Sequence, residues 1–118
     1  KDTMSDRIIH YTPTTTVVAT DTPSHGNACH YYEVRNTDGD VLCRIHFQAG
    51  PIKENGANGI QHVDLLAIIR HRLDGFQSGP FASGVNDVTR GFIDAAMASD
   101  ATRTRLRELA GTEGTSKV

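Results

Sequence analysis

The sequence predicts an α+β fold, with a small N-terminal antiparallel β-sheet in residues 1–50 and a long C-terminal helical hairpin in residues 51–118. Three observations support this prediction. β-Branched segments fill the first part, an Asp-Gly pair separates two alternating apolar runs, and apolar residues recur at helical spacing on either side of Gly79-Pro80. A chain of 118 residues is the size of one small domain.

The predicted sheet begins with two β-branched segments, residues 8–11 and 15–19, on either side of Pro13. After a polar loop at residues 20–28, residues 30–48 form a hairpin centred on Asp38-Gly39, a strong two-residue turn signal. The expected pairs across it are Asn36 with Val41, Val34 with Cys43, Tyr32 with Ile45, and His30 with Phe47. Alternation then gives this hairpin one apolar face.

The cysteines and histidines do not predict a disulfide or a metal site. Cys43 faces Val34 in the expected register and Cys29 lies beyond the last pair, so we expect free thiols and the reducing cytosol. Cys43 and His46 are three apart on a strand and point to opposite faces. His62 and His71 are nine apart on a helix, which is not a ligand spacing. We therefore expect no metal and no cofactor.

The first predicted helix, residues 61–77, has an apolar face wider than a surface helix needs. Its main stripe consists of Leu66, Ile69, Leu73 and Phe76. Leu65 and Ile68 lie outside that stripe. Either the sheet covers the extra apolar surface or other copies of the chain do, and the small size of the sheet favours other copies.

The second predicted helix spans residues 85–110. Pro80 ends the first helix, Ser83 is the expected N-cap, and Gly111 is the expected residue just past the C-terminus. At 1.5 Å per residue this helix is about 40 Å long and extends past its shorter partner.

Two groups of side chains suggest ligand binding. Arg103 and Arg107 share one face near the end of the second helix, and arginine holds phosphates through two parallel hydrogen bonds. The alternative is a solvated basic face that pairs with Asp100 or Glu108. At the turn between the helices, Phe76, Phe81 and Asn86 could stack on a base and bind its edge, although core packing explains both phenylalanines equally well.

Composition narrows the function. The net charge of −2 argues against a generic nucleic-acid polymer binder. No apolar run approaches the length of a membrane span. Residues 49–59 contain glycines and a lysine but lack the G-K-[ST] of a phosphate loop. No catalytic constellation is visible, so we expect a protein that is not an enzyme.

Several motifs together resemble one family. They are GPIKENGANG at residues 50–59, D-L-L-A-I-I-x-x-R-L-x-G-F-Q-x-G-P-F-A at residues 64–82, R-T-R-x-R at residues 103–107, and G-x-E-G-T at residues 111–115. This region resembles the helical hairpin shared by phage type-one Thoeris anti-defence proteins and anti-CBASS cyclic-nucleotide sponges. The preceding I-H-F-Q-A-G-P-I-K-E segment resembles the Thoeris branch.

The resemblance implies a homo-oligomer, usually a hexamer, in the host cytoplasm. It would sequester immune signals, namely glycocyclic ADP-ribose isomers or cyclic oligonucleotides, without cleaving them. The matching motifs assign six ligand-binding residues: Phe76, Phe81, Asn86, Arg103, Thr104 and Arg107. This chain has Leu109-Ala110 where many relatives carry paired arginines, which predicts weaker pyrophosphate binding or a different ligand.

Two other functions stay open from the sequence. One is an enzyme that degrades the same nucleotides, with His62 or His71 as a base, and the other is a small module that binds DNA or a host factor through the basic helix end.

Overall fold

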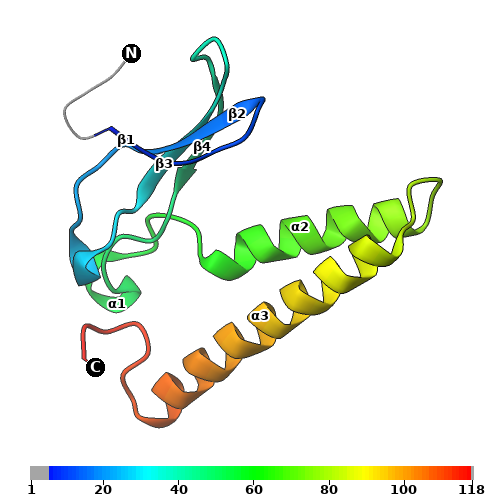
Figure 1. The fold of residues 1–118 in the computed structure, drawn as a ribbon. Helices are drawn as coiled ribbons and strands as arrows, with labels where there is room; N and C mark the ends of the chain where they lie inside the picture. The colour runs from blue at the N-terminus through cyan, green and yellow to red at the C-terminus, as the bar shows by residue number, and fades with distance from the viewer. Residues whose placement is uncertain (1–5, 118) are drawn as a thin grey trace. The chain divides into compact units, whose positions relative to one another are not determined.

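The computed structural model describes residues 6–117. They form two compact units (Figure 1). The first contains the chain up to Ile60 together with Gly114–Ser116, and the second contains Gln61–Glu113 with Lys117. A four-stranded antiparallel sheet precedes two long helices, so the predicted α+β class is confirmed.

The sheet of the first unit is a meander in which each strand pairs with the next one along the chain (Figure 1). Its strands are β1 (Arg7–Tyr11), β2 (Thr15–Ala19), β3 (Tyr31–Asn36) and β4 (Val41–His46). Both β-branched segments predicted as strands are confirmed. The polar loop between β2 and β3 contains one short 3₁₀ turn, η1 (His25–Asn27).

The β3–β4 turn corrects one part of the predicted register. Val34 pairs with Cys43 and Tyr32 with Ile45, as predicted, but Val41 pairs with Arg35 instead of Asn36. The loop has three residues, because Asn36 N donates to Asp40 O at 2.9 Å and Gly39 N donates to Asn36 O at 3.0 Å. Gly39 has φ = 88°, which suits the bulge that follows a type I turn in such loops.

The side chain of Asn36 explains why the longer turn is preferred. Its Oδ1 accepts hydrogen bonds from the backbone N–H groups of Asp38 and Asp40, both at 2.9 Å. A two-residue turn would leave these two donors without that partner. Cys43 faces Val34 as expected, and both Cys29 and Cys43 are free thiols.

The core of the first unit is small. Val18 and Ala19 of β2 are its buried apolar residues among those described, and His30 is the buried polar one. His30 is held at both ends: its backbone N donates to Asp21 Oδ2 at 2.9 Å, and its Nε2 lies 3.1 Å from the carbonyl oxygen of His25. The rings of Tyr32 and Phe47 meet edge to face at 5.8 Å.

The connector after β4 is a compact loop closed by amide side chains. It includes a single helical turn, α1 (Ile52–Asn55), which is too short for periodicity to reveal. Gln48 Nε2 donates to the carbonyl oxygens of Gly50 and Gly56, and Asn58 exchanges two hydrogen bonds with the backbone of Ala49.

The segment Gly114–Ser116 joins this first unit at α1. Lys53 N donates to Gly114 O at 2.9 Å, and both the backbone N and the Oγ of Ser116 donate to a Glu54 carboxylate oxygen. Residues after Gly111 thus make hydrogen bonds within the same chain.

The second unit is the predicted helical hairpin. It consists of α2 (His62–Gln77) and the longer α3 (Gly84–Leu109). Gln61 and Asp64 form a reciprocal capping box at the start of α2. At the end of α3, Gly111 has φ = 72° and occupies the predicted position past the C-cap.

Much of the hairpin's apolar surface is uncovered in the chain. Ile68 on α2 is 63% exposed, and on α3 Val85 and Phe92 are 74% and 72% exposed. Neither α2 nor α3, nor any other helix in residues 6–117, combines the length and hydropathy needed to cross a membrane.

Gly59 provides a test of how the connector closes against β4. The backbones of Phe47 and Ile60 form a parallel bridge, and a Cβ on Gly59 would lie 2.4 Å from the Phe47 carbonyl carbon. Because backbone cannot yield easily, we expect Gly59→Ala to lower the free energy of unfolding by about 1–3 kcal/mol in urea titration.

The matched control is Gly75→Ala in α2, where an added Cβ meets nothing within 4 Å. That change should stabilise the helix by about 0.5–1 kcal/mol. Equal stability of the Gly59→Ala and parent proteins would contradict the close backbone approach.

Candidate ligand-binding site

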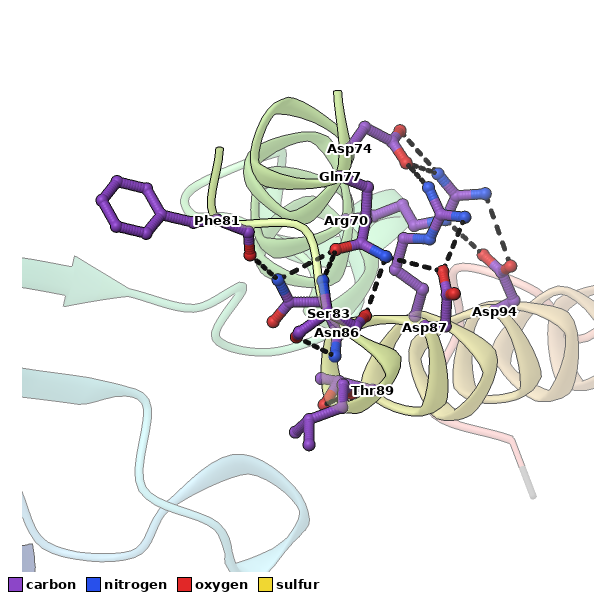
Figure 2. Close-up of polar contacts among 11 residues, drawn as sticks. Arg70, Asp74, Gln77, Phe81, Ser83, Asn86, Asp87, Thr89 and Asp94 are labelled. Carbon is purple, nitrogen blue, oxygen red and sulfur yellow. Dashed lines mark hydrogen bonds and ion pairs between the residues drawn. The ribbon is translucent and has the colours of Figure 1, made fainter. Parts of the chain in front are cut away.

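The turn between α2 and α3 is organised by the amide of Gln77 (Figure 2). Its Oε1 accepts from Ser83 N at 2.9 Å and from Asn86 Nδ2 at 3.0 Å. Its Nε2 donates to Ser83 O at 2.9 Å and to Asp87 Oδ1 at 2.8 Å. One side chain from the end of α2 therefore fixes the first turn of α3.

Ser83 and Asn86 complete the start of α3. Ser83 is the N-cap, as predicted, and its Oγ accepts from Asn86 N at 3.1 Å. Asn86 Nδ2 also donates to the Phe81 carbonyl oxygen at 3.1 Å, which ties the loop to the helix. The sequence GPFAS thus forms a rigid turn rather than a loose connection.

The two predicted aromatic residues lie together at this turn. The rings of Phe76 and Phe81 meet edge to face with centroids 6.4 Å apart. The Arg72 guanidinium carbon stands 4.9 Å from the Phe76 centroid, in reach of a cation–π contact. Phe81 is 73% exposed and its ring points away from the polar network in Figure 2. The Phe81 ring therefore stands largely uncovered at the turn, while its backbone carbonyl holds the Asn86 amide.

Ion pairs join α2 and α3 next to the turn. The Asp74 carboxylate accepts from Arg70 Nη1 at 2.6 Å and from Arg90 Nη1 at 2.7 Å. Arg70 Nε also donates to Asp94 at 2.7 Å, while Arg90 pairs with Asp87 at 3.3 Å. These side chains are one-third to two-thirds exposed, so solvent screens each ion pair and weakens it. The pairs stabilise the hairpin mainly because they are connected in a network.

The network changes the ionisation of Asp94. The hydrogen bond from Arg70 is the main reason that the pKa of Asp94 lies below its ordinary value of 3.8, while partial desolvation opposes the shift. The same bond raises the pKa of Arg70. The negative form of Asp94 is therefore the one that holds the hairpin.

The remaining predicted ligand residues lie near the far end of α3. Arg103 is exposed and has no hydrogen bond or ion pair in residues 6–117. Thr104 is half-buried. The alternative predicted for this region, pairing with Asp100 or Glu108, is not found among the ion pairs of the described chain.

Arg107 binds the residues that follow α3. Its Nε pairs with Glu113 at 3.3 Å, and its Nη2 donates to the carbonyl oxygens of Thr112 and Lys117 at 2.8 and 3.0 Å. The guanidinium thereby holds the residues that follow α3.

The structure thus divides the six predicted residues into two clusters. The turn cluster is Phe76, Phe81 and Asn86, and the arginine cluster is Arg103, Thr104 and Arg107. Arg103 follows Asn86 by 17 residues on one unbroken helix, which places them roughly 25 Å apart along its axis. One chain alone does not bring both clusters into a single pocket.

Two hollows lie on the sheet of the first unit. The larger has a volume of about 540 Å³ and is lined by residues of β1, β2 and β3, including Arg7 and Arg35. Arg35 is paired with Asp6 at 3.2 Å and Glu33 at 2.8 Å, so its charge is already neutralised. None of the six predicted residues lines either hollow.

Sequence reasoning missed the side chains that hold the turn. The sequence does contain a charge pattern here, with Arg70 and Asp74 spaced i, i+4 and Asp87 and Arg90 spaced i, i+3. Spacing within one helix does not show which side chains pair between two helices. Gln77 carried no chemical signal of its own. In residues 6–117, no three His, Cys, Asp or Glu side chains are grouped as a metal site would require.

Comparison with known proteins gives one informative similarity. No protein-family model matches the chain. Over 74 residues, 63% of its length, the chain is 38% identical to the protein named Thoeris anti-defense 1 of Bacillus phage SBSphiJ7. The matched region covers 52% of that protein, so the chain spans about half the length of its relative.

The depressed pKa of Asp94 predicts how the hairpin responds to acid. A carboxylate whose pKa is lowered by folding contributes stability above about pH 3.8, and this contribution is lost as the pH falls through the folded value. Asp94→Asn should therefore be less stable than the parent at pH 7, and the difference should vanish near pH 2 in thermal melts followed by circular dichroism.

Asp100→Asn is the matched control, because Asp100 lies on the same helix and has no ion pair with any other described residue. It should change stability little at either pH. A gap between Asp94→Asn and parent that is the same at both pH values would show that the Arg70 contact does not stabilise the hairpin.

Proposed function

We propose that this chain, a Thoeris anti-defence protein by its similarity to the phage relative, binds immune signal nucleotides and sequesters them without cleavage. The proposed ligands are glycocyclic ADP-ribose isomers or cyclic oligonucleotides, bound in the cytoplasm of the host cell. The uncovered apolar face of α3, which runs in line with Arg103, is the observation that carries the proposal.

The two clusters have complementary chemistry for such a ligand. Phe81 offers an exposed ring for stacking on a base, and the neighbouring Asn86 offers a fixed polar group for its edge. Within residues 6–117 the Arg103 guanidinium is unengaged, which suits a pair of phosphate oxygens. A compact cyclic nucleotide needs both kinds of contact within one pocket.

Copies of the chain would supply that pocket. Because the clusters lie at opposite ends of α3, antiparallel α3 helices from two copies would bring the turn cluster of one to the arginine cluster of the other. We therefore propose a homo-oligomer, a hexamer in its full form, with pockets at contacts between subunits.

The surface of α3 fits this arrangement. Val85, Val88 and Phe92 are spaced i, i+3 and i+7, and each is at least 60% exposed. Arg103 follows Val85 by 18 residues, which is five full helical turns, so it lies on the same line. Covering the Phe92 side chain alone would contribute about 1.5–3 kcal/mol to association. Packing of another copy on this face is therefore favourable, and it would bring Arg103 to the contact.

Mass action explains how binding alone would block immunity. A pocket with a nanomolar Kd, about −12 kcal/mol, leaves little free signal for an effector when the protein exceeds the signal in concentration. Such affinity requires groups that are ordered before binding. The hydrogen-bonded turn provides that order for Phe81 and Asn86.

Arg103→Ala tests the arginine cluster. Loss of a charge-assisted hydrogen bond costs about 1.5–3 kcal/mol, so nucleotide affinity should fall by roughly ten- to a hundredfold or more in calorimetry. Native mass spectrometry should show an unchanged number of subunits.

Arg105→Ala is the matched control, because Arg105 is equally exposed but lies about 200° around the helix from Arg103. It should retain affinity. Arg107→Ala should also lose binding, although it releases the Thr112 and Lys117 carbonyls as well, so Arg103 is the sharper test. Unchanged affinity in Arg103→Ala would remove the arginine cluster from the site.

The fate of the bound nucleotide distinguishes a sponge from an enzyme. A panel of glycocyclic ADP-ribose isomers and cyclic di- and trinucleotides is incubated with the protein, the complex is heated, and the released molecules are separated by chromatography. We expect the intact ligand in amounts equal to the bound protein sites. A cleavage product that accumulates with time would establish an enzyme instead.

A further inference from the structure

The connector after β4 contains the dipeptide Asn-Gly twice, at residues 55–56 and 58–59. In such a pair the glycine nitrogen can attack the carbonyl carbon of the asparagine side chain, because glycine has no Cβ to hinder the approach. Ammonia leaves and a cyclic succinimide forms. Water then opens the ring at either carbonyl and gives aspartate or isoaspartate. The two pairs are alike in sequence, but their surroundings in the connector differ.

The fold restrains the second pair, Asn58-Gly59. Asn58 Oδ1 accepts from Ala49 N and its Nδ2 donates to Ala49 O, both at 2.8 Å. Turning this amide toward the Gly59 nitrogen would break both hydrogen bonds. The backbone cannot move to compensate, because Gly59 packs so closely that an added Cβ would overlap the backbone of Phe47. The two reacting atoms therefore meet only when the connector opens.

The first pair, Asn55-Gly56, lies at the open end of α1 (Figure 1). Asn55 is exposed, and its side chain lies beside Gly50 without a hydrogen bond to any residue in the described range 6–117. A Cβ on Gly56 would meet nothing within 4 Å, so there is room for movement. The Gly56 nitrogen is restrained by its hydrogen bond to Ile52 O at 2.8 Å. A single helical turn is marginally stable, so this bond opens readily.

We propose that Asn55-Gly56 is a site of spontaneous deamidation, whereas the fold preserves Asn58-Gly59. Hydroxide removes the proton of Gly56 N, and the nitrogen forms a bond to Asn55 Cγ. The bond from Cγ to the side-chain nitrogen breaks, and this nitrogen leaves as ammonia with a proton from water. A second water opens the succinimide to a carboxylate. The reaction needs no oxidant or reductant and is faster at higher pH.

Isoaspartate at position 55 would change the contacts of α1. The former side-chain methylene enters the main chain and lengthens it by one carbon, which moves Gly56 N away from Ile52 O. The same helical turn holds Gly114–Ser116 through Lys53 N and the Glu54 carboxylate. Deamidation is therefore expected to loosen this later segment.

The rates at the two asparagines test the proposal. The full chain is kept in mildly alkaline buffer and digested with trypsin at intervals. The peptide of residues 54–70 contains both sites, and fragmentation in the mass spectrometer locates each product. We expect Asn58 to react about tenfold to a hundredfold more slowly than Asn55, the effect of two added hydrogen bonds. In concentrated urea the two rates should become similar, because the fold no longer restrains either pair.

Asn55→Gln is the matched control, because its longer side chain does not form the succinimide. Deamidated parent protein is separated by anion exchange through its added negative charge. We expect the backbone N–H of Ser116 to exchange with deuterium faster in this fraction than in fresh protein. Asn55→Gln kept in the same buffer should gain no charge at position 55 and should show unchanged exchange.

Three results would overturn the proposal. They are equal rates at Asn55 and Asn58 in the folded protein, a rate ratio that urea leaves unchanged, and an Asn55 that stays intact while the unfolded chain reacts. None of these results bears on nucleotide binding, because the inference does not depend on the proposed function.

Discussion

Charged and amide side chains near the turn hold α2 against α3. In most helical pairs, apolar side chains make this contact. Asp74 bridges Arg70 and Arg90, and Gln77 holds the first turn of α3. Leu66 and Leu73 of α2 and Ile93 of α3 are half-buried alongside these polar groups, whereas Phe92 is 72% exposed. Covering exposed apolar surface such as that of Phe92 would add to the stability of the hairpin.

The hydrogen bonds at the turn also give it a precise geometry. Apolar packing tolerates small rotations, whereas the four hydrogen bonds of Gln77 and the two of Asn86 Nδ2 have directions. These directions set the backbone of Phe81 and the amide of Asn86. Rigid placement of this kind reduces the entropy lost on binding.

The similarity to the phage relative covers about half of that protein's length. The motifs that carry the resemblance lie in residues 50–115, in the hairpin and its flanking segments. The six proposed ligand residues all lie in that region, and none of them lines the sheet hollow beside Arg7 and Arg35.

Local signals in the sequence were sufficient for the strands and the two long helices, and insufficient for the side-chain contacts between the helices. Ser83, Pro80 and Gly111 marked the ends of the helices correctly, because capping depends on neighbours within a few residues. The β3–β4 turn was predicted one residue too short, because the Asn36 side chain outweighed the Asp-Gly signal.

The geometry of the site was only partly visible in the sequence. Phe76, Phe81 and Asn86 do lie close together, since the hairpin turn joins them. Nothing in the order of residues showed that Gln77 would orient Asn86, because that pairing spans two helices. The separation of Arg103 from the turn follows from the length of the helix alone.

The guanidinium of Arg107, one of the proposed ligand residues, already has partners within the chain. The carbonyl oxygens of Thr112 and Lys117 and the carboxylate of Glu113 occupy its guanidinium. A phosphate that binds there must displace them and free the segment that they belong to. Capture of the messenger and loosening of this terminal strap would then be thermodynamically linked, so the composition of the last few residues would tune affinity without touching the ligand.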